Sequence, residues 1–464
     1  MRILFAASEV FPFIKTGGLA DVASALPRAL AQNGHDVRVV CPKYKQLKYE
    51  YLPYLDKVAT VHVLNRMFTI EQAFYEGVRY YFVDNYELYH RDTIYESDDR
   101  DVQFAVFNEV ILSMLPAIDF CPDVIHCNDW QTGLVPLFLM QRYRHQAFYQ
   151  NIRTMYTIHN LRFQGIFNAN IIRELGYEYH DHDVNFMAQG ILYASKISTV
   201  SQTYAEEILT DFYGEGLNHL LQYRQADLIG IVNGIDQSVF DPSIDAFLPF
   251  NYSLETVELK ADNKKVLQEQ FNLATESKTP LIGLVTRLDS QKGLDLVTRV
   301  IEELLQTADV QIFLLGSGEA KYEQYFSMLK TKYPTQFGLY IGYNEAVARL
   351  VYAASDFFLM PSLYEPCGLS QLISLKYGSI PIVRETGGLN DTVLSFNEYT
   401  YTGNGFSFKH YNAHDMLYTI RRALAIYHDN QDAYRLLVYR GMVADYSWTA
   451  AATKYVQVYQ SLRG

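Results

Sequence analysis

Strand-like apolar runs alternate with helix-like segments along the whole chain, and this alternation restricts the possible folds more than any other feature. Such runs lie at residues 2–7, 37–41, 80–84, 123–127, 154–158 and 196–200 in the first half, and at 280–285, 310–316, 356–360 and 380–383 in the second. Strands that alternate with amphipathic helices are typical of parallel sheets covered by helices. The sequence therefore predicts an α/β protein with two doubly wound domains.

The length of the chain also favours two domains. A chain of 464 residues exceeds what one hydrophobic core usually supports. Residues 233–253 are rich in Asn, Asp, Pro and Gly and lack a clear period, as a linker would. We predict an N-terminal Rossmann-like domain at 1–240, a C-terminal one at 241–446, and a terminal helix at 447–464 that begins with the N-cap Ser447.

Composition and charge exclude several classes of function. The net charge of -13 repels nucleic acid and anionic membranes, so neither is expected as the main partner. No run of 18 apolar residues indicates a membrane span, and the apolar start is too short for a signal peptide. Because the four cysteines form no CxxC pair and suggest no disulfide framework, we expect a cytoplasmic protein.

The string Thr-Gly-Gly-Leu-x-Asp occurs twice, at residues 16–21 and 386–391. Each copy follows a predicted strand and opens a helix, and Lys15 precedes the first. Glycines let the backbone approach a ligand, while the free N–H groups of a helix start favour negative charge. Because ligands of open α/β sheets bind beyond the carboxyl ends of the strands, we expect both copies to face one cleft between the domains. The alternative is that the glycines only permit tight turns.

Other predicted strands are also followed by charged or polar side chains. Arg287 and Lys292 share one loop before a helix, and two cations there suit a diphosphate. Glu365 precedes an amphipathic helix, where it would bind hydroxyls, balance a cation or satisfy helix N–H groups. Asp129 and His159 follow consecutive strands, as side chains that line a cleft do, although a lone histidine is more often structural.

Two further motifs are weak. Gly316 and Gly318 follow a strand, but Lys321 stands where a dinucleotide motif requires Gly or Ala, so a nicotinamide cofactor is poorly supported. Asp-x-Asp, a pattern that can bind a metal, occurs at 99–101 and 181–183. Both triplets lie in polar, charged surroundings, which favours solvated loops. We expect neither a cofactor nor a metal ion.

Seven motifs closely resemble, in order and spacing, those of bacterial glycogen synthase and plant starch synthase. They are KTGGLADV, HCNDWQTGL, IHN, VNGID, RLDSQKGLDL, EPCGLSQL and TGGLNDTV, and the agreement covers essentially the whole chain. The resemblance implies the GT-B fold, with two Rossmann-like domains across a deep cleft and a terminal helix that crosses back to the first. It also implies retaining transfer of glucose from ADP-glucose to the non-reducing end of an α-1,4-glucan.

The resemblance further implies roles for single residues. Those expected to act in catalysis are Lys15, His159, Arg287, Lys292 and Glu365. The donor would also contact Gly17, Gly18, Asn233, Tyr343, Cys367, Gly368, Leu369, Gly387 and Gly388, with Tyr343 stacked on adenine. The acceptor and sugar subsite would be lined by Glu9, Tyr95, Asp129, His159 and Asn160. Many related GT-B enzymes place a second glutamate eight positions after the first. This chain has Ile373 there, so we do not expect a second carboxylate to recognise the ribose.

Other functions stay open at this stage. A different retaining transferase of the same fold, using UDP-glucose or a small sugar acceptor, would share these motifs because base choice depends on pocket shape. A glycan phosphorylase is less favoured, since no lysine context suits a pyridoxal cofactor. Outside enzymes, the alternative is a glucan-binding protein without the chemistry. The cationic residues weigh against it, because a pure binder needs no leaving-group site.

Overall fold

The computed structural model describes residues 1–463, which form two compact units. Unit 1 comprises Met1–Asn233 together with the chain from Trp448 onward, and unit 2 comprises Gly234–Ser447. The chain therefore leaves unit 1 at Asn233, and the predicted boundary near residue 240 falls inside unit 2. Residues 234–253 contain no helix or strand, in keeping with their composition.

Unit 1 contains a nine-stranded sheet with the order β11-β10-β7-β6-β1-β2-β5-β4-β3. Its strands are parallel except that β4 runs antiparallel to both β3 and β5. The strands of this sheet are β1 (Arg2–Ala6), β2 (Asp36–Pro42), β3 (Asp56–Val63), β4 (Arg66–Tyr75), β5 (Val78–Asp84), β6 (Val124–Asn128), β7 (Arg153–Ile158), β10 (Lys196–Thr199) and β11 (Leu228–Gly230). A separate antiparallel pair consists of β8 (Ile166–Asn168) and β9 (Asp183–Asn185).

The helices of unit 1 contribute buried apolar side chains to the same core as this sheet. They are α1 (Gly18–Gln32), α2 (Tyr86–Tyr89), α3 (Arg100–Ala117), α4 (Val135–Phe138), α5 (Asn170–Glu174), α6 (Phe186–Tyr193), α7 (Gln202–Glu207), α8 (Asn218–Tyr223) and α17 (Trp448–Ser461), with short turns η1 (Tyr49–Tyr54), η2 (Trp130–Thr132), η3 (Leu139–Tyr143) and η4 (Gln225–Asp227). In α1 the buried side chains include Leu19, Val22 and Leu26, which share one face of the helix at this spacing.

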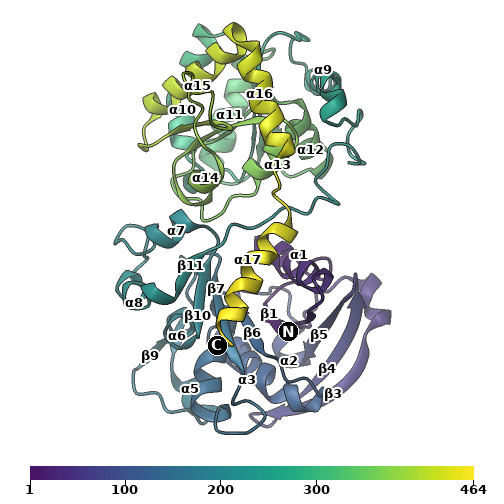
Figure 1. Ribbon diagram of the computed structural model, residues 1–464, viewed down its shortest axis with the longest axis vertical. Coiled ribbons are helices and arrows are strands. Elements are labelled where there is room, and N and C mark those ends of the chain that lie inside the picture. The colour runs from purple at the N-terminus through teal and green to yellow at the C-terminus, as the bar shows by residue number, and fades with distance from the viewer. Residues whose placement is uncertain (464) are drawn as a thin grey trace. The chain divides into compact units, whose positions relative to one another are not determined.

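The last helix, α17, packs beside α1 in unit 1 (Figure 1). Its Tyr455 and Tyr459 are fully buried. The Tyr459 hydroxyl lies 2.7 Å from Nδ1 of His126 on β6, and burial lowers the pKa of His126 to about 3. A neutral histidine therefore hydrogen-bonds the helix to the centre of the sheet.

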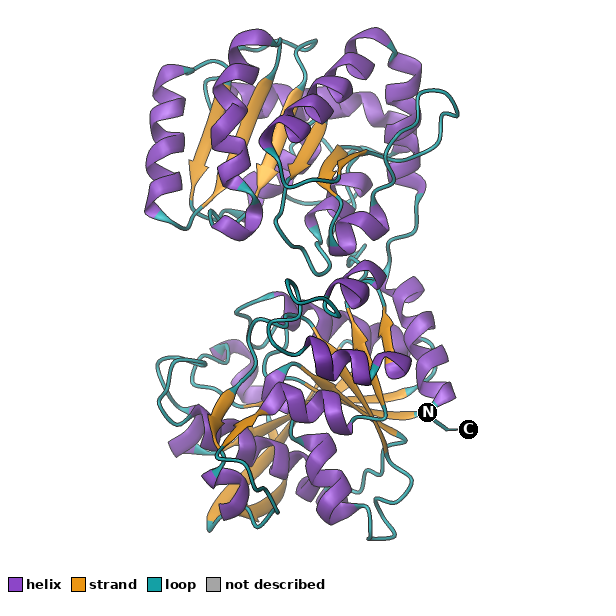
Figure 2. Ribbon diagram, turned by 90° about the vertical axis from the view of Figure 1, so that its left-hand side faces the viewer, coloured by secondary structure: helices purple, strands orange, loops and turns teal. Residues whose placement is uncertain are grey.

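Unit 2 contains a parallel six-stranded sheet with the order β14-β13-β12-β15-β16-β17. The strands are β12 (Leu281–Val285), β13 (Gln311–Gly316), β14 (Phe337–Ile341), β15 (Phe357–Met360), β16 (Ile380–Arg384) and β17 (Phe406–Phe408). Helices cover both faces (Figure 2). They are α9 (Lys260–Gln270), α10 (Leu294–Thr307), α11 (Ala320–Lys332), α12 (Glu345–Ala354), α13 (Ser370–Lys376), α14 (Gly387–Thr392), α15 (Ala413–Asp429) and α16 (Gln431–Val443), with short turns η5 (Leu254–Leu259) and η6 (Ser290–Lys292).

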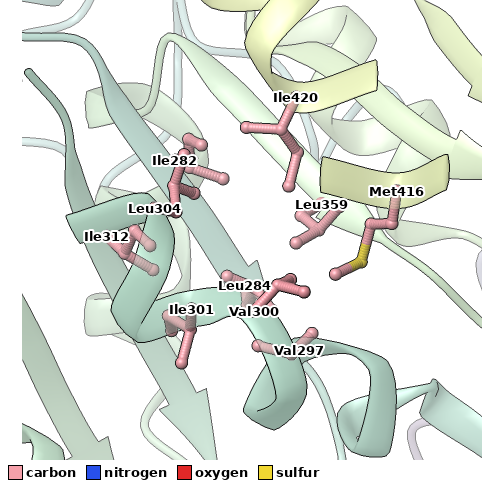
Figure 3. Close-up of a pocket in the computed structure, with 10 residues that line it drawn as sticks. All are labelled: Ile282, Leu284, Val297, Val300, Ile301, Leu304, Ile312, Leu359, Met416 and Ile420. Atoms are coloured by element: carbon pink, nitrogen blue, oxygen red, sulfur yellow. The ribbon is translucent and has the colours of Figure 1, made fainter. Parts of the chain in front are cut away.

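A small cavity of about 10 Å³ lies inside unit 2, where α10 and α15 face the sheet (Figure 3). Apolar side chains line it, among them Ile282, Leu304 and Met416. A water molecule needs polar partners and roughly this much space, and this lining offers none. The cavity is therefore a packing defect of the core rather than a substrate site.

The prediction of two α/β domains with parallel sheets is confirmed. Every strand expected from the apolar runs is present, with ends shifted by at most two residues. The apolar runs did not indicate β3, β4, β8, β9, β11, β14 or β17. Most of these strands lie at or near a sheet edge or are only three residues long.

Candidate active site

The candidate residues of unit 1 follow three neighbouring strands. β7, β6 and β1 are adjacent in the sheet, and their carboxyl ends lead to His159, Asp129 and Glu9 respectively. Side chains from consecutive loops at one edge of a parallel sheet converge there. Polar contacts tie these loops to one another and to neighbouring residues.

Asp129 holds the loop after β7. Its Oδ1 accepts hydrogen bonds from the backbone N–H groups of His159 at 2.8 Å and Asn160 at 3.4 Å. Burial raises the pKa of Asp129 to about 7, aided by the charge of Glu9, although the two backbone N–H groups oppose the shift. Its φ of 53° lies in a region that L-residues rarely adopt, and such strain is concentrated at functional sites.

His159 is neutral and its tautomer follows from its partner. Its Nε2 lies 2.9 Å from Asn128 Oδ1, while Asn128 Nδ2 donates to the carbonyls of Ala6 and His126. Asn128 Oδ1 must therefore accept, which places the proton on His159 Nε2 and leaves Nδ1 as an acceptor. Burial lowers the pKa of His159 to about 4, so it remains uncharged near pH 7.

Glu9 lies in the loop after β1, and its carboxylate contacts the residues just before α1. It is 4% exposed, and its Oε2 accepts hydrogen bonds from the N–H and hydroxyl of Thr16 and from the N–H of Gly17 at 3.2 Å. The expected free N–H of Gly17 is thus taken by a carboxylate of the same chain. A Cβ at Gly18 would meet no atom within 4 Å, so space for a ligand exists at the second glycine.

The remaining candidates of unit 1 are Lys15, Tyr95 and Asn233, and each has different surroundings. Lys15 is exposed, and its Nζ lies 2.8 Å from Asp21 Oδ1. The Tyr95 hydroxyl lies 2.8 Å from Ser8 Oγ, one residue before Glu9. Asn233 is buried, and its Oδ1 has no hydrogen-bond partner within residues 1–463. A buried polar atom of this kind is consistent with a ligand contact.

In unit 2, Lys292 and Glu365 form an ion pair. Lys292 Nζ lies 2.7 Å from Glu365 Oε2, with side-chain exposures of 16% and 9%. The Ser362 hydroxyl donates to the same oxygen at 3.0 Å. Since β12 and β15 are neighbours, the loops that follow them meet. Of the roles open to Glu365, the structure shows it balancing a cation.

Backbone contacts hold these two loops together. Leu363 N donates to Gln291 O at 2.8 Å, and Gln291 Nε2 donates to Tyr364 O at 3.3 Å. Gly293 has φ 70°, and a Cβ there would lie 2.0 Å from Pro361 O. Glycine is therefore required for the contact that brings Lys292 to Glu365.

The second glycine pair packs against the Glu365 loop. A Cβ at Gly387, which has φ 45°, would lie 1.9 Å from Glu365 O, and one at Gly388 would lie 1.9 Å from Cys367 O. Gly388 N also donates to Glu365 O and Pro366 O, both at 3.1 Å. Gly387 and Gly388 thus permit a tight turn, and the loop they support contains Cys367, Gly368 and Leu369. Intramolecular packing therefore explains the second copy, whereas Gly18 in the first borders open space.

The side chain of Arg287 contacts different residues from that of Lys292. Its side chain is 69% exposed, and its Nη2 lies 3.4 Å from Asp289 Oδ2 and 3.3 Å from Gln291 Oε1. The two cations share one loop, as expected, but only Lys292 is held by a buried carboxylate. Arg287 is positioned to meet an anion from solvent.

Tyr343 follows β14, and its side chain is 72% exposed. Ile373, by contrast, is 6% exposed within α13. The position eight residues after Glu365 therefore faces the protein interior. Gly318 is also explained by packing, because a Cβ there would lie 2.5 Å from Leu288 O.

Sequence reasoning missed Ser362, Asn128 and Arg384. Arg384 Nη1 donates to the carbonyls of Ser362 at 3.4 Å and Leu363 at 2.8 Å, which supports the loop that carries Glu365. A charged residue at the end of a predicted strand, next to the second glycine turn, was the available signal for Arg384. Ser362 and Asn128 carry no such signal.

The Asp-x-Asp triplets contain side chains that are already paired. Asp99 accepts from Arg91, and Asp183 lies 2.7 Å from His182 Nδ1. Within residues 1–463, no cluster of three or more His, Cys, Asp or Glu side chains has a geometry that could hold a metal ion. The expectation that the reaction needs no metal stays a prediction.

None of the helices described for residues 1–463 has the length and apolar character needed to cross a bilayer. All four cysteines are free thiols.

Two family models cover most of the chain. "Starch synthase catalytic domain" matches residues 2–223, and "Glycosyl transferases group 1" matches residues 266–435. Together with the paired parallel-sheet units, these matches define a glycosyltransferase of the GT-B fold. The prediction of this fold is confirmed.

Full-length relatives identify the family. The chain is 49% identical to a glycogen synthase of Geobacillus thermodenitrificans and 50% identical to one of Clostridium novyi, in each case over 100% of this chain, and over 98% and 99% of the relatives. It belongs to the glycogen synthase and starch synthase family, as its motifs indicate.

Solved structures agree with this assignment. The catalytic domain of starch synthase IV from Arabidopsis thaliana, bound to ADP and acarbose, has a TM-score of 0.89 and 31% identity, over 100% of this chain and 99% of that one. A sucrose-phosphate synthase from Thermosynechococcus elongatus has a TM-score of 0.63 and 17% identity, over 99% and 98%, and this likeness supports the fold alone.

Proposed function

We propose that the protein transfers glucose from ADP-glucose to the non-reducing end of an α-1,4-glucan, with retention of configuration. The observation that carries the proposal is the Lys292–Glu365 pair at the adjacent carboxyl ends of β12 and β15, in a chain of this family. The related starch synthase IV structure holds ADP and acarbose, which supports a nucleotide and a glucan as ligands here.

The leaving diphosphate would be stabilised by cationic side chains. As the bond from C1 to the phosphate breaks, negative charge gathers on the phosphate oxygens. Arg287 and Lys292 would bind these oxygens, with Lys15 of unit 1 as a third contact. Preorganised charges that act where charge develops are commonly the largest catalytic contribution.

Glu365 would serve the sugar rather than the phosphates. Its Oε2 is engaged by Lys292 and Ser362, which holds the carboxylate in place. Its other oxygen would accept hydrogen bonds from glucose hydroxyls, and Lys292 would share its charge between the carboxylate and the phosphate. The loop backbone at Cys367, Gly368 and Leu369 would complete the donor site.

The glucan side would be formed by unit 1. His159 is neutral, so its Nδ1 would accept a hydrogen bond from a sugar hydroxyl and would not act as an acid near pH 7. Asp129 fixes this loop through its backbone contacts. Asn160, Tyr95 and Glu9 would complete the subsite around it.

Retention would follow attack from the leaving-group side. In this step the bond between C1 and the phosphate oxygen breaks, the acceptor oxygen bonds to C1, and the acceptor proton passes to the leaving phosphate. Two successive inversions would need a free nucleophilic carboxylate. Both carboxylates considered for that role are engaged, Asp129 by backbone amides and Glu365 by Lys292 and Ser362. A glucosyl-enzyme trapped without acceptor would contradict this mechanism.

The direct test is incubation of the purified protein with radiolabelled ADP-glucose and a maltooligosaccharide. We expect label in longer oligosaccharides, all of it released by an enzyme that cleaves α-1,4 bonds. Parallel reactions with UDP-glucose test the competing donor. Incorporation from UDP-glucose but not ADP-glucose would favour another transferase of this fold, and glucan binding without any transfer would contradict the proposal.

A cytoplasmic location is proposed as well, since free cysteines are typical of a reducing compartment.

A further inference from the structure

The backbone of unit 2 holds Tyr343 in a defined direction. Gly342 has φ 125°, a value that favours glycine, and Gly342 N donates to Gly316 O at the end of β13 at 2.9 Å. The next residue, Tyr343, leaves the loop with its side chain 72% exposed. An exposed aromatic ring on a fixed turn is a suitable platform for a planar ligand.

Glu345 joins the hydroxyl of this tyrosine to a buried arginine. Glu345 is the first residue of α12, and its Oε2 accepts a hydrogen bond from the Tyr343 hydroxyl. Its Oε1 accepts from Arg349 Nε at 2.7 Å. Burial, together with Glu345, raises the pKa of Tyr343, so the phenol keeps its proton and remains the donor.

Arg349 is itself buried and contacts several residues. It is 3% exposed, and its Nη1 donates to Val239 O at 2.6 Å and to Asp245 Oδ2 at 3.2 Å. Its guanidinium carbon lies 3.9 Å from the ring centroid of Phe240. These partners belong to residues 234–253, so a buried cation anchors both this segment and Glu345.

We propose that Glu345 is a positioning residue for the donor, because it fixes the ring of Tyr343 against the buried Arg349 as a platform for the nucleotide base. This inference rests on the proposed function and on the role that the family resemblance implies for Tyr343, which is stacking on adenine. A tyrosine without this hydrogen bond would sample other rotamers, and binding the base would then require ordering the ring again. The alternative is that Glu345 acts only as a first-turn acid of α12.

The test compares Glu345→Ala, Tyr343→Phe and the double variant. Each single change should raise the KM for ADP-glucose by about three- to tenfold, with kcat and the KM for glucan unchanged. The double variant should be no worse than the more affected single variant, because both changes break one hydrogen bond. Glu345→Gln keeps an acceptor for the Tyr343 hydroxyl and should lie closer to the wild type. Tyr418→Phe, which alters a tyrosine 71% exposed on α15, is the matched control and should change nothing.

A fourth variant separates failure of this inference from failure of the proposed function. If Tyr343→Ala leaves the donor KM unchanged, Tyr343 is not the base platform and both ideas are wrong at this position. If Tyr343→Ala raises the KM while Glu345→Ala and Tyr343→Phe do not, only the positioning role is wrong. Additive effects in the double variant, or a fall in Tm without a change in KM, would indicate the first-turn role instead.

Discussion

Lys292 Nζ lies 2.7 Å from Glu365 Oε2, and both side chains are largely buried. The loops that carry them follow adjacent strands, so the pair joins two elements 73 residues apart. Each partner therefore has a structural role, as a counter-charge, besides its proposed role in transfer.

Lys292→Met should reduce both activity and stability. Loss of a charge that stabilises the leaving group typically costs about 10²–10³ in kcat. Breaking a buried ion pair costs about 3–5 kcal/mol, and the remaining exposure of Lys292 favours the lower end. Thermal unfolding and initial rates measure the two effects.

Glu365→Gln added to Lys292→Met should separate them. The neutral amide no longer leaves a buried charge unpaired, so the Tm should recover while transfer stays low. Recovery of both quantities, or a single variant with wild-type Tm, would show that the pair does not have the double role described.

Gly18→Ala and Gly388→Ala should differ sharply, although both change the same repeated turn. A Cβ at Gly388 would lie 1.9 Å from Cys367 O, whereas one at Gly18 would meet no atom within 4 Å. We expect Gly388→Ala to lower stability by about 1–3 kcal/mol or more, and Gly18→Ala to keep the wild-type Tm with reduced transfer. Denaturant unfolding and rate assays test the contrast, and a destabilised Gly18→Ala would contradict it.

Asp129→Asn should change the pH dependence of stability. The pKa of Asp129 is raised from 3.8 to about 7, so the folded state holds a proton that the unfolded state releases between these values. Stability contributed by this group therefore falls as the pH rises from about 4 to 7. The variant should have a higher Tm than the wild type at pH 8 and the same Tm at pH 3.5, with lower activity. Parallel Tm curves for the two proteins across this pH range would show that the pKa of Asp129 is not raised by folding.

Tyr459→Phe should loosen α17. The change removes the partner of a buried histidine nitrogen, and a buried polar group left unsatisfied costs about 1–3 kcal/mol. Urea unfolding should therefore show a lower midpoint. Thr453→Val, on the same helix at an exposed position, is the control and should have little effect.

Excess chelator should leave the transfer rate unchanged. One aspartate of each Asp-x-Asp triplet already has a partner, Asp99 with Arg91 and Asp183 with His182, and the proposed chemistry relies on Arg287 and Lys292 for charge. Loss of activity that added divalent cations restore would overturn this expectation.

The central strands of both sheets were predictable because they are buried on both faces. Such strands, for example β1 and β13, are continuous apolar runs in the sequence. β3 and β4 were missed because they form an antiparallel edge, where exposed and buried side chains mix. β17 was missed because three residues are too few for a periodic signal.

The site was predictable as a set of residues but not as a set of contacts. The motifs indicated Lys292, Glu365, Asp129 and His159. The pairing of Lys292 with Glu365 depends on β12 and β15 being neighbours, and strand order is not visible in an apolar pattern. Glu9 was assigned to the sugar subsite, whereas its contacts with Thr16 and Gly17 depend on how the loop after β1 folds back.

The return of α17 to unit 1 has a consequence for how the protein is made. Tyr455 and Tyr459 belong to the same buried core as β1 and β6, yet they are synthesised after all of unit 2. Part of the apolar surface of unit 1 must therefore stay uncovered until residues 448–461 have been translated. Unit 2 is an insertion within unit 1 and is under no such delay. A nascent chain stalled before residue 448 should consequently expose the α1 and β6 surfaces to chaperones.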